Sequence, residues 1–147
     1  MVVSFVFAGV AVADFAAAYE WYVRLLGRGA DMFPHERESV WRLTPTGSIY
    51  VVEDRERAGS SLLTLALDDL DACERRLRDG EFSFSEETDG GAPRRLVVRD
   101  NDGNRLTFFQ NPPGRMSRRV GQCSGMTPEE LLRDRAPKIV DQAEASG

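Results

Sequence analysis

The chain has 147 residues, of which 41% are hydrophobic and 29% are charged, a balance that excludes a disordered chain and favours one compact domain with a real core. Its formal net charge of -5, from 19 basic and 24 acidic residues, argues against a nucleic-acid partner. No apolar run in the sequence reaches the length of a membrane span, and no basic segment precedes the first apolar stretch, so we expect a cytoplasmic protein without a membrane partner.

The first half of the chain is predicted to form a strand, a helix and three further strands. Residues 2–12 are apolar or small with several β-branched valines, which is typical of a buried strand. Asp14 is placed to cap a helix over residues 15–26, where aromatic and leucine side chains recur at helical spacing, and Gly27 supplies a left-handed end. Three short strands should follow, separated by proline-containing turns: Ala30–Phe33, Val40–Thr44 and Ser48–Glu53.

The second half repeats this order. Leu62–Leu67 is predicted as a strand, Asp68 or Asp69 as the cap of the second helix, and Gly80 as its end. Three strands complete the second set: Ser83–Glu86, Arg94–Arg99 and Arg105–Gln110. Because a duplicated unit places equivalent positions opposite each other, a site formed by one half should have counterparts in the other.

The repeat stops at Gln110, and residues 111–147 are predicted to be a C-terminal extension. The segment 127–130, Thr-Pro-Glu-Glu, has the form of a capping box with proline at the first helical position. It predicts a short helix over Pro128–Arg135. The sequence leaves open whether this extension packs on the domain or on a second subunit.

Four segments of the repeat form a recognisable pattern: Gly9-Val10-Ala11-Val12-Ala13-Asp14, Trp21-Tyr22 before Leu25-Leu26-Gly27, Leu67-Asp68-Asp69-Leu70-Asp71, and Arg99-Asp100-Asn101-Asp102-Gly103-Asn104-Arg105-Leu106. The pattern resembles the vicinal oxygen chelate superfamily, which includes glyoxalase I, the bleomycin-resistance proteins and the extradiol dioxygenases. The resemblance implies an α+β fold over residues 1–110, in which two tandem βαβββ modules, residues 3–53 and 61–110, form a curled, cup-shaped mixed sheet. The ligand is then expected inside the cup.

The same resemblance identifies four strand positions where metal-dependent relatives carry His, Glu or Gln. Aligned on this sequence, these positions are Phe7, Val51, Leu62 and Thr107. None of them is a metal ligand of ordinary strength, and the chain has one histidine. We therefore expect no metal and no cofactor, and we interpret the segment 100–104 as a tight turn rather than a calcium loop.

The remaining cup is expected to bind a small, flat or aromatic molecule with an anionic or carbonyl group, because strand alternation gives it an apolar and aromatic lining. The residues predicted to bind the ligand are Phe5, Phe7, Trp41, Ile49, Val51, Leu62, Thr64, Arg105, Thr107 and Phe109. The alternative is that these side chains fill the cup as a second core.

Three functions remain open. The one we favour is a metal-independent small-molecule binding protein that sequesters a drug or metabolite, and the resemblance implies a homodimer with its pocket at the subunit interface. The second is a metal-independent isomerase, lyase or cyclase with His35, Glu53 or Tyr50 as acid or base, although His35 lies in a predicted turn and is expected to be exposed. The third is a structural or protein-interaction module with a filled cup.

Overall fold

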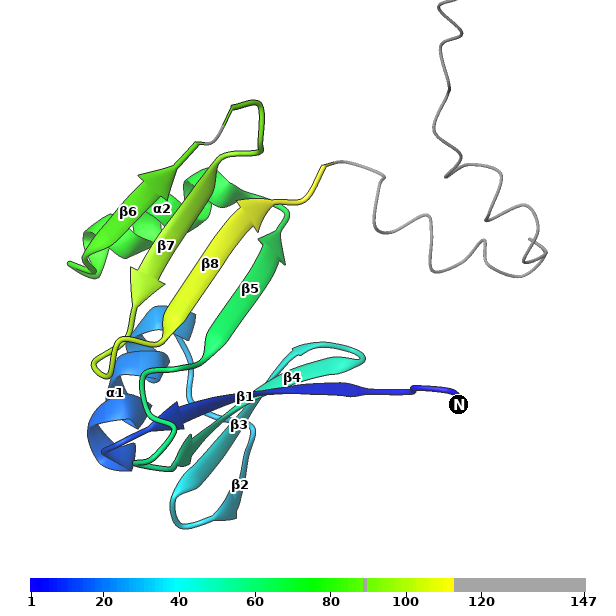
Figure 1. Ribbon diagram of the computed structural model, residues 1–147, viewed down its shortest axis with the longest axis vertical. Helices are drawn as coiled ribbons and strands as arrows, with labels where there is room; N and C mark the ends of the chain where they lie inside the picture. The colour runs from blue at the N-terminus through cyan, green and yellow to red at the C-terminus, as the bar shows by residue number, and fades with distance from the viewer. Residues whose placement is uncertain (89, 113–147) are drawn as a thin grey trace, which may run out of the picture. The chain divides into compact units, whose positions relative to one another are not determined.

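The chain folds into two βαβββ modules, each a four-stranded sheet with one helix (Figure 1). The computed structural model describes residues 1–88 and 90–112, so the helix predicted at Pro128–Arg135 lies outside the described residues. Backbone contacts divide the chain into Met1–Asn111, which holds both modules, and Pro112–Gly147. Within the described residues, neither helix has the length and apolar character that a membrane crossing needs.

The order of elements predicted from the sequence is confirmed in both modules. The first module runs β1 (Val6–Val12), α1 (Phe15–Leu26), β2 (Met32–His35), β3 (Glu38–Thr44) and β4 (Gly47–Glu53). The second runs β5 (Leu62–Leu67), α2 (Leu70–Asp79), β6 (Phe84–Glu87), β7 (Arg95–Arg99) and β8 (Arg105–Gln110). One turn was misplaced, since Pro34 and His35 belong to β2. An edge strand tolerates this proline because one side of its backbone has no partner strand.

The strand orders are β1-β4-β3-β2 and β5-β8-β7-β6. In each sheet the first and last strands of the module pair in parallel and the other pairs are antiparallel, so the fold is α+β with mixed sheets. The two sheets are not hydrogen-bonded into one, although β1 and β5 meet where the Ser61 hydroxyl accepts from the Ala11 amide at 3.1 Å. The single cup expected from the sequence is therefore not closed within the chain.

Equivalent aspartates begin the two helices. Asp14 Oδ1 accepts from the Ala17 amide at 3.1 Å, and Asp69 Oδ1 accepts from the Ala72 amide at 2.8 Å. Each carboxylate satisfies one of the backbone donors that a helix N-terminus leaves free. Gly27, at a φ of 74°, gives α1 its predicted left-handed end.

The helix-covered faces of both sheets share one hydrophobic core. Its buried members come from both modules, among them Val10, Val51, Leu63, Leu77 and Phe108. The rings of Trp21 on α1 and Phe82 after α2 meet edge to face, with centroids 5.5 Å apart. Because both sheets turn their helix-covered faces toward this core, their opposite faces are left open.

The two helices also cap each other. Arg76 Nε on α2 donates to the Leu25 carbonyl at 2.8 Å, and Arg24 Nη2 on α1 donates to the Gly80 carbonyl at 3.1 Å. Cationic side chains at helix C-termini satisfy free carbonyls and complement the helix dipole. This exchange ties the end of each module's helix to the other module.

A buried polar cluster between the modules is organised by Asp100. Its carboxylate accepts from the amides of Asp102 and Asn104, both at 2.9 Å, and from the Tyr22 hydroxyl at 3.0 Å. The Asn104 side chain donates to the Ala11 carbonyl at 2.7 Å. Burial, reinforced by the charge of Asp100, raises the pKa of Tyr22 well above its ordinary range. The segment 100–104 is thus a tight turn that joins β8 to the first module.

Candidate functional site

The candidate site consists of the two sheet faces that neither α1 nor α2 covers, which we call the open faces. Since side chains alternate along a strand, each open face is defined by every second residue. On β1 and β4 the open face of module 1 carries Phe7, Gly9, Ala11, Ser48, Tyr50 and Val52. The open face of module 2 carries Leu62, Thr64, Arg95, Arg105, Thr107 and Phe109.

The open face of module 1 is aromatic. A Cβ placed on Gly9 would lie 2.5 Å from the ring and hydroxyl of Tyr50, so the tyrosine ring rests directly on this glycine. Phe7 is 56% exposed, and its ring lies 4.7 Å from that of Phe5. A shallow cavity of about 430 Å³ beside Tyr50 extends to Ser61. This face offers a surface on which a flat molecule can stack.

The open face of module 2 is more polar. Leu62 is 82% exposed at its edge, and Thr64 stands opposite Thr107 in the parallel pair of β5 and β8. One terminal guanidinium nitrogen of Arg105, Nη2, donates to both carboxylate oxygens of Glu87, at 2.9 and 2.7 Å. A cavity of about 260 Å³ is lined by the two threonines, Leu62, Arg105 and Arg95 among others.

The structure contradicts the predicted facing of Ile49 and Val51. Both point into the shared core and are 2% and 0% exposed, so neither reaches an open face. In the sequence, Val51 pairs with Thr107 when the glycines that precede the two strands, Gly47 and Gly103, are matched. The ladders instead place Ser48 opposite Phe7 and Arg105 opposite Leu62, a difference of one residue. Such a slip moves every side chain to the other face, so Tyr50 is the counterpart of Thr107.

Trp41 also lies in the core rather than at the site. It is fully buried, its ring stacks on Tyr19 at 5.7 Å, and its Nε1 donates to the Arg28 carbonyl at 3.1 Å. The other predicted ligand-binding residues belong to the open faces, but the structure does not bring them together in one chain. Those of module 1 are Phe5 and Phe7, and those of module 2 are Leu62, Thr64, Arg105, Thr107 and Phe109.

The three candidate acid–base residues are dispersed. Glu53 faces α1, where its carboxylate accepts from the Phe15 amide at 3.3 Å and pairs with Arg37 at 2.9 Å. His35 is exposed on the edge strand β2, opposite Glu38. Tyr50 alone lies on an open face. These residues form no acid–base pair with each other in the described part of the chain.

Sequence reasoning did not find Arg95 and Glu87. They lie on β7 and β6, directly opposite each other in the ladder, beside Phe109 on β8. Residues paired directly across a sheet share a face, so Arg95 and Glu87 lie on the same face as Phe109. The sequence does not show this, because it does not give the registers of these strands.

The residues of the open faces do not fit a divalent metal. On β1, β4, β5 and β8, the oxygen-bearing side chains of the open faces are the hydroxyls of Ser48, Tyr50, Thr64 and Thr107. Metal centres in proteins favour imidazole, thiolate or carboxylate donors. Among residues 1–88 and 90–112, no group of three or more His, Cys, Asp or Glu side chains is placed to hold an ion.

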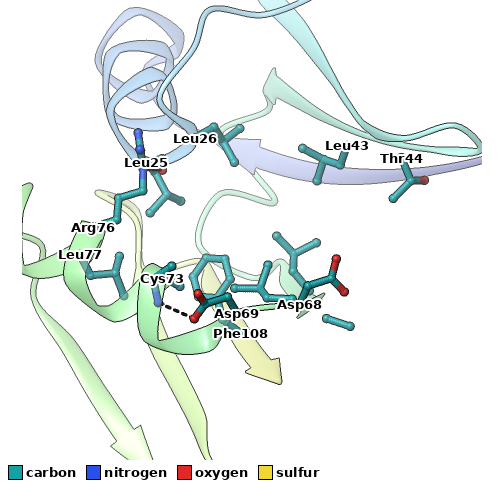
Figure 2. A pocket seen from close by; sticks show the side chains of 14 residues that line it. Leu25, Leu26, Leu43, Thr44, Asp68, Asp69, Cys73, Arg76, Leu77 and Phe108 are labelled. Atoms are coloured by element: carbon teal, nitrogen blue, oxygen red, sulfur yellow. Dashed lines mark hydrogen bonds between the residues drawn. The ribbon is translucent and has the colours of Figure 1, made fainter. Parts of the chain in front are cut away.

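A larger cavity, of about 580 Å³, lies between the modules on the helix side (Figure 2). Its walls include Leu26 and Leu43 of module 1, and Leu67, Cys73 and Phe108 of module 2. Most of these side chains belong to the shared core or pack against it. None of the candidate residues lines this cavity, which is the margin of the core rather than part of the open faces.

Comparison with known proteins places this geometry in a family. A model of the Glyoxalase/Bleomycin resistance protein/Dioxygenase superfamily matches residues 4–108. The chain belongs to this superfamily. The resemblance inferred from the repeated segments is thereby confirmed, and the match covers both modules.

Solved structures of the superfamily share the fold. A glyoxalase/bleomycin resistance protein from Catenulispora acidiphila is 38% identical, with a TM-score of 0.69 over 74% of this chain and 98% of that chain. TnmS3, an antibiotic-binding protein from a Streptomyces species, is 25% identical, with a TM-score of 0.63 over 76% of this chain and 99% of that chain. A bleomycin-binding protein solved with bleomycin is 20% identical, with a TM-score of 0.57 over 73% and 98% of the two chains, and supports the fold alone. No curated protein matches the chain significantly.

Proposed function

We propose that the protein binds a small, flat or aromatic organic molecule without a metal ion, and sequesters it in a cup made by two copies of the chain. The observation that carries this proposal is the exposure of Phe7 and Leu62 on the open faces, at 56% and 82%. Large apolar side chains on uncovered sheet faces are typical of ligand-binding or subunit surfaces. The ring of Tyr50, seated on Gly9, adds a second aromatic contact.

The need for two copies follows from the direction of the open faces. The helix-covered faces of both modules share one core, so a single chain cannot turn its two open faces toward each other. A second copy can place its module 2 opposite module 1 of the first, and the reverse contact then forms by symmetry.

The metal-independent part of the proposal is supported by the donor set. Phenol and threonine hydroxyls are poor ligands for divalent metals at neutral pH, and the aligned positions also carry Phe7 and Leu62. TnmS3, which is described as antibiotic-binding, supports an organic ligand of drug size.

The proposal is tested by titrating the purified full chain with a panel of polycyclic aromatic compounds and measuring fluorescence quenching. Tyr50→Ala is expected to weaken binding by up to about tenfold, because an aromatic contact contributes about 0.5–1.5 kcal/mol. Phe33→Ala is the matched control, since Phe33 is 54% exposed but its ring lies 5.5 Å from Tyr19 on the helix side. Equal losses in both variants would contradict an open-face site.

Two further measurements address the remaining parts of the proposal. Elemental analysis should find no stoichiometric transition metal, and finding one would overturn the metal-independent reading. Sedimentation should show a dimer, and ligand binding of full affinity by a monomer would contradict a cup made by two copies. Recovery of the compound chemically unchanged is expected of sequestration, whereas a product would indicate turnover.

A further inference from the structure

The small cavity on the open face of module 2 has an excess of positive charge. Arg95 and Arg105 both line it, and their ion pairs within the described residues go to the same carboxylate, that of Glu87. Two guanidinium groups that share one carboxylate leave one positive charge without a counterion. The neighbouring strand β5 contributes the uncharged side chains of Leu62 and Thr64, so it supplies no counterion.

The two arginines differ in how well they are satisfied. Arg105 donates to both oxygens of Glu87 through Nη2, and its Nε lies 3.4 Å from the Thr107 hydroxyl. Arg95 stands 4.0 Å from the nearest oxygen of Glu87, which is too far for a hydrogen bond. Its Nε is buried and has no hydrogen-bond partner in the described part of the chain. A ligand cannot reach this buried atom, but the Arg95 side chain as a whole is 35% exposed, and its exposed part can donate to a ligand oxygen.

The rest of the cavity fits an oxyanion joined to an apolar body. Thr64 and Thr107, side by side on β5 and β8, supply hydroxyl donors, while Leu62 supplies an apolar wall. Glu87 does not line the cavity and its charge is paired with Arg105, so Glu87, Arg95 and Arg105 together contribute a net positive charge beside it. A volume of about 260 Å³ accommodates a carboxylate and the ring that bears it, but not a whole drug-sized molecule.

We infer that the ligand is an aromatic molecule carrying a carboxylate, with the carboxylate bound by Arg95 and the hydroxyls of Thr64 and Thr107. This rests on the proposed function, because the aromatic body is to be covered by Phe7 and Tyr50 of the facing module in a second copy. Arg95 is the residue that selects the charge of the ligand, since Glu87 holds it at 4.0 Å and holds Arg105 at 2.7 Å. Arg105 is held by Glu87 and sets the positive field around the site.

The test uses three probes with the same ring and different charge: naphthoate, naphthylmethanol and naphthylmethylamine. Isothermal titration of the full chain should show naphthoate bound about tenfold to a hundredfold more tightly than the alcohol, as expected for one charge-assisted hydrogen-bond pair. The amine should bind most weakly. The preference for naphthoate should diminish with added salt.

Arg95→Gln is expected to abolish the preference for naphthoate over naphthylmethanol. Arg95→Lys keeps the charge but loses the planar, bidentate guanidinium, and should retain a reduced preference. Arg99→Gln is the matched control: Arg99 lies on the same strand, donates to the Gly103 carbonyl at 3.1 Å and does not line the cavity, so the preference should persist. Equal losses in Arg95→Gln and Arg99→Gln would assign the effect to overall charge and overturn the inference.

The outcomes separate this inference from the proposed function. Equal affinity of the wild type for the three probes, with all three weakened by Tyr50→Ala, would overturn the carboxylate assignment and leave the aromatic site standing. Failure of every probe to bind would overturn both. Tighter binding of the amine than of naphthoate would refute the assignment of charge directly.

Discussion

Replacing Tyr22 by phenylalanine removes one buried hydrogen bond from the contact between the modules. Tyr22 is fully buried, and its hydroxyl donates to Asp100 Oδ2 at 3.0 Å. A hydrogen bond to a charged group contributes about 1.5–3 kcal/mol. Asp100 keeps donors from Asp102 and Asn104 in the variant, so the cluster is weakened rather than lost. We expect Tyr22→Phe to lower the free energy of unfolding by about 1.5–3 kcal/mol at pH 7.

The dependence of this difference on pH is a sharper test. Burial and the charge of Asp100 raise the pKa of Tyr22 above the value of about 10 that a tyrosine has in an unfolded chain. Above pH 10 the unfolded chain therefore releases the phenol proton while the folded chain retains it. The stability from Tyr22 is complete below about pH 10, and falls by up to about 1.4 kcal/mol per pH unit above it. The advantage of the wild type over Tyr22→Phe should be constant from pH 7 to 9 and shrink beyond 10.

The assay is urea denaturation followed by tryptophan fluorescence at a series of pH values. Tyr19→Phe is the control, because it makes the same change on the same helix, and the Tyr19 hydroxyl makes no side-chain hydrogen bond in the described residues. The control should change the free energy of unfolding by less than about 0.5 kcal/mol. A Tyr22→Phe variant as stable as the control, or one whose deficit does not shrink above pH 10, would refute this account of the Asp100 cluster.

Two further substitutions test the open face and the helix contact. Gly9→Ala brings a Cβ to 2.5 Å from Tyr50 and should displace its ring, weakening aromatic ligands by up to about tenfold in the fluorescence titration. If Gly9→Ala changed neither the affinity for aromatic ligands nor the melting temperature, the contact between Gly9 and Tyr50 would be contradicted. Arg76→Ala removes the guanidinium bonded to the Leu25 carbonyl at 2.8 Å, and should cost about 1–2 kcal/mol in urea denaturation. Arg75→Ala, an exposed change on the same helix, should cost less than about 0.5 kcal/mol, and equal losses would rule out the capping role.

The local structure was predictable because its signals are local. The caps at Asp14 and Asp69 need only a carboxylate within three residues of a backbone amide, a spacing that is visible in the sequence. Strand and helix order follows from side-chain periodicity and from the glycines and prolines that interrupt it. The recurrence of that order in both halves then identified the family.

The facing of strands was not predictable from the repeat alone. Ser48, opposite Phe7, follows Gly47 by one residue, whereas Arg105, opposite Leu62, follows Gly103 by two, so matching the glycines shifts the two strands by one residue. The shift exchanged Tyr50 for Val51 at the open face, because adjacent residues of a strand point to opposite sides. The register depends on how many residues each turn contains before pairing begins. The first paired residue is fixed by contacts with strands that are distant in the sequence.

The repeat by itself therefore determined that two equivalent modules exist and which residues begin their helices. Only the tertiary structure decided that the modules share a core through their helix-covered faces and leave Phe7 and Leu62 exposed on separate open faces. It also brought Arg95, Arg105 and Glu87 together from three strands. The physical reason is that periodicity records which side chains share a face, whereas register and packing depend on contacts between residues distant in the sequence.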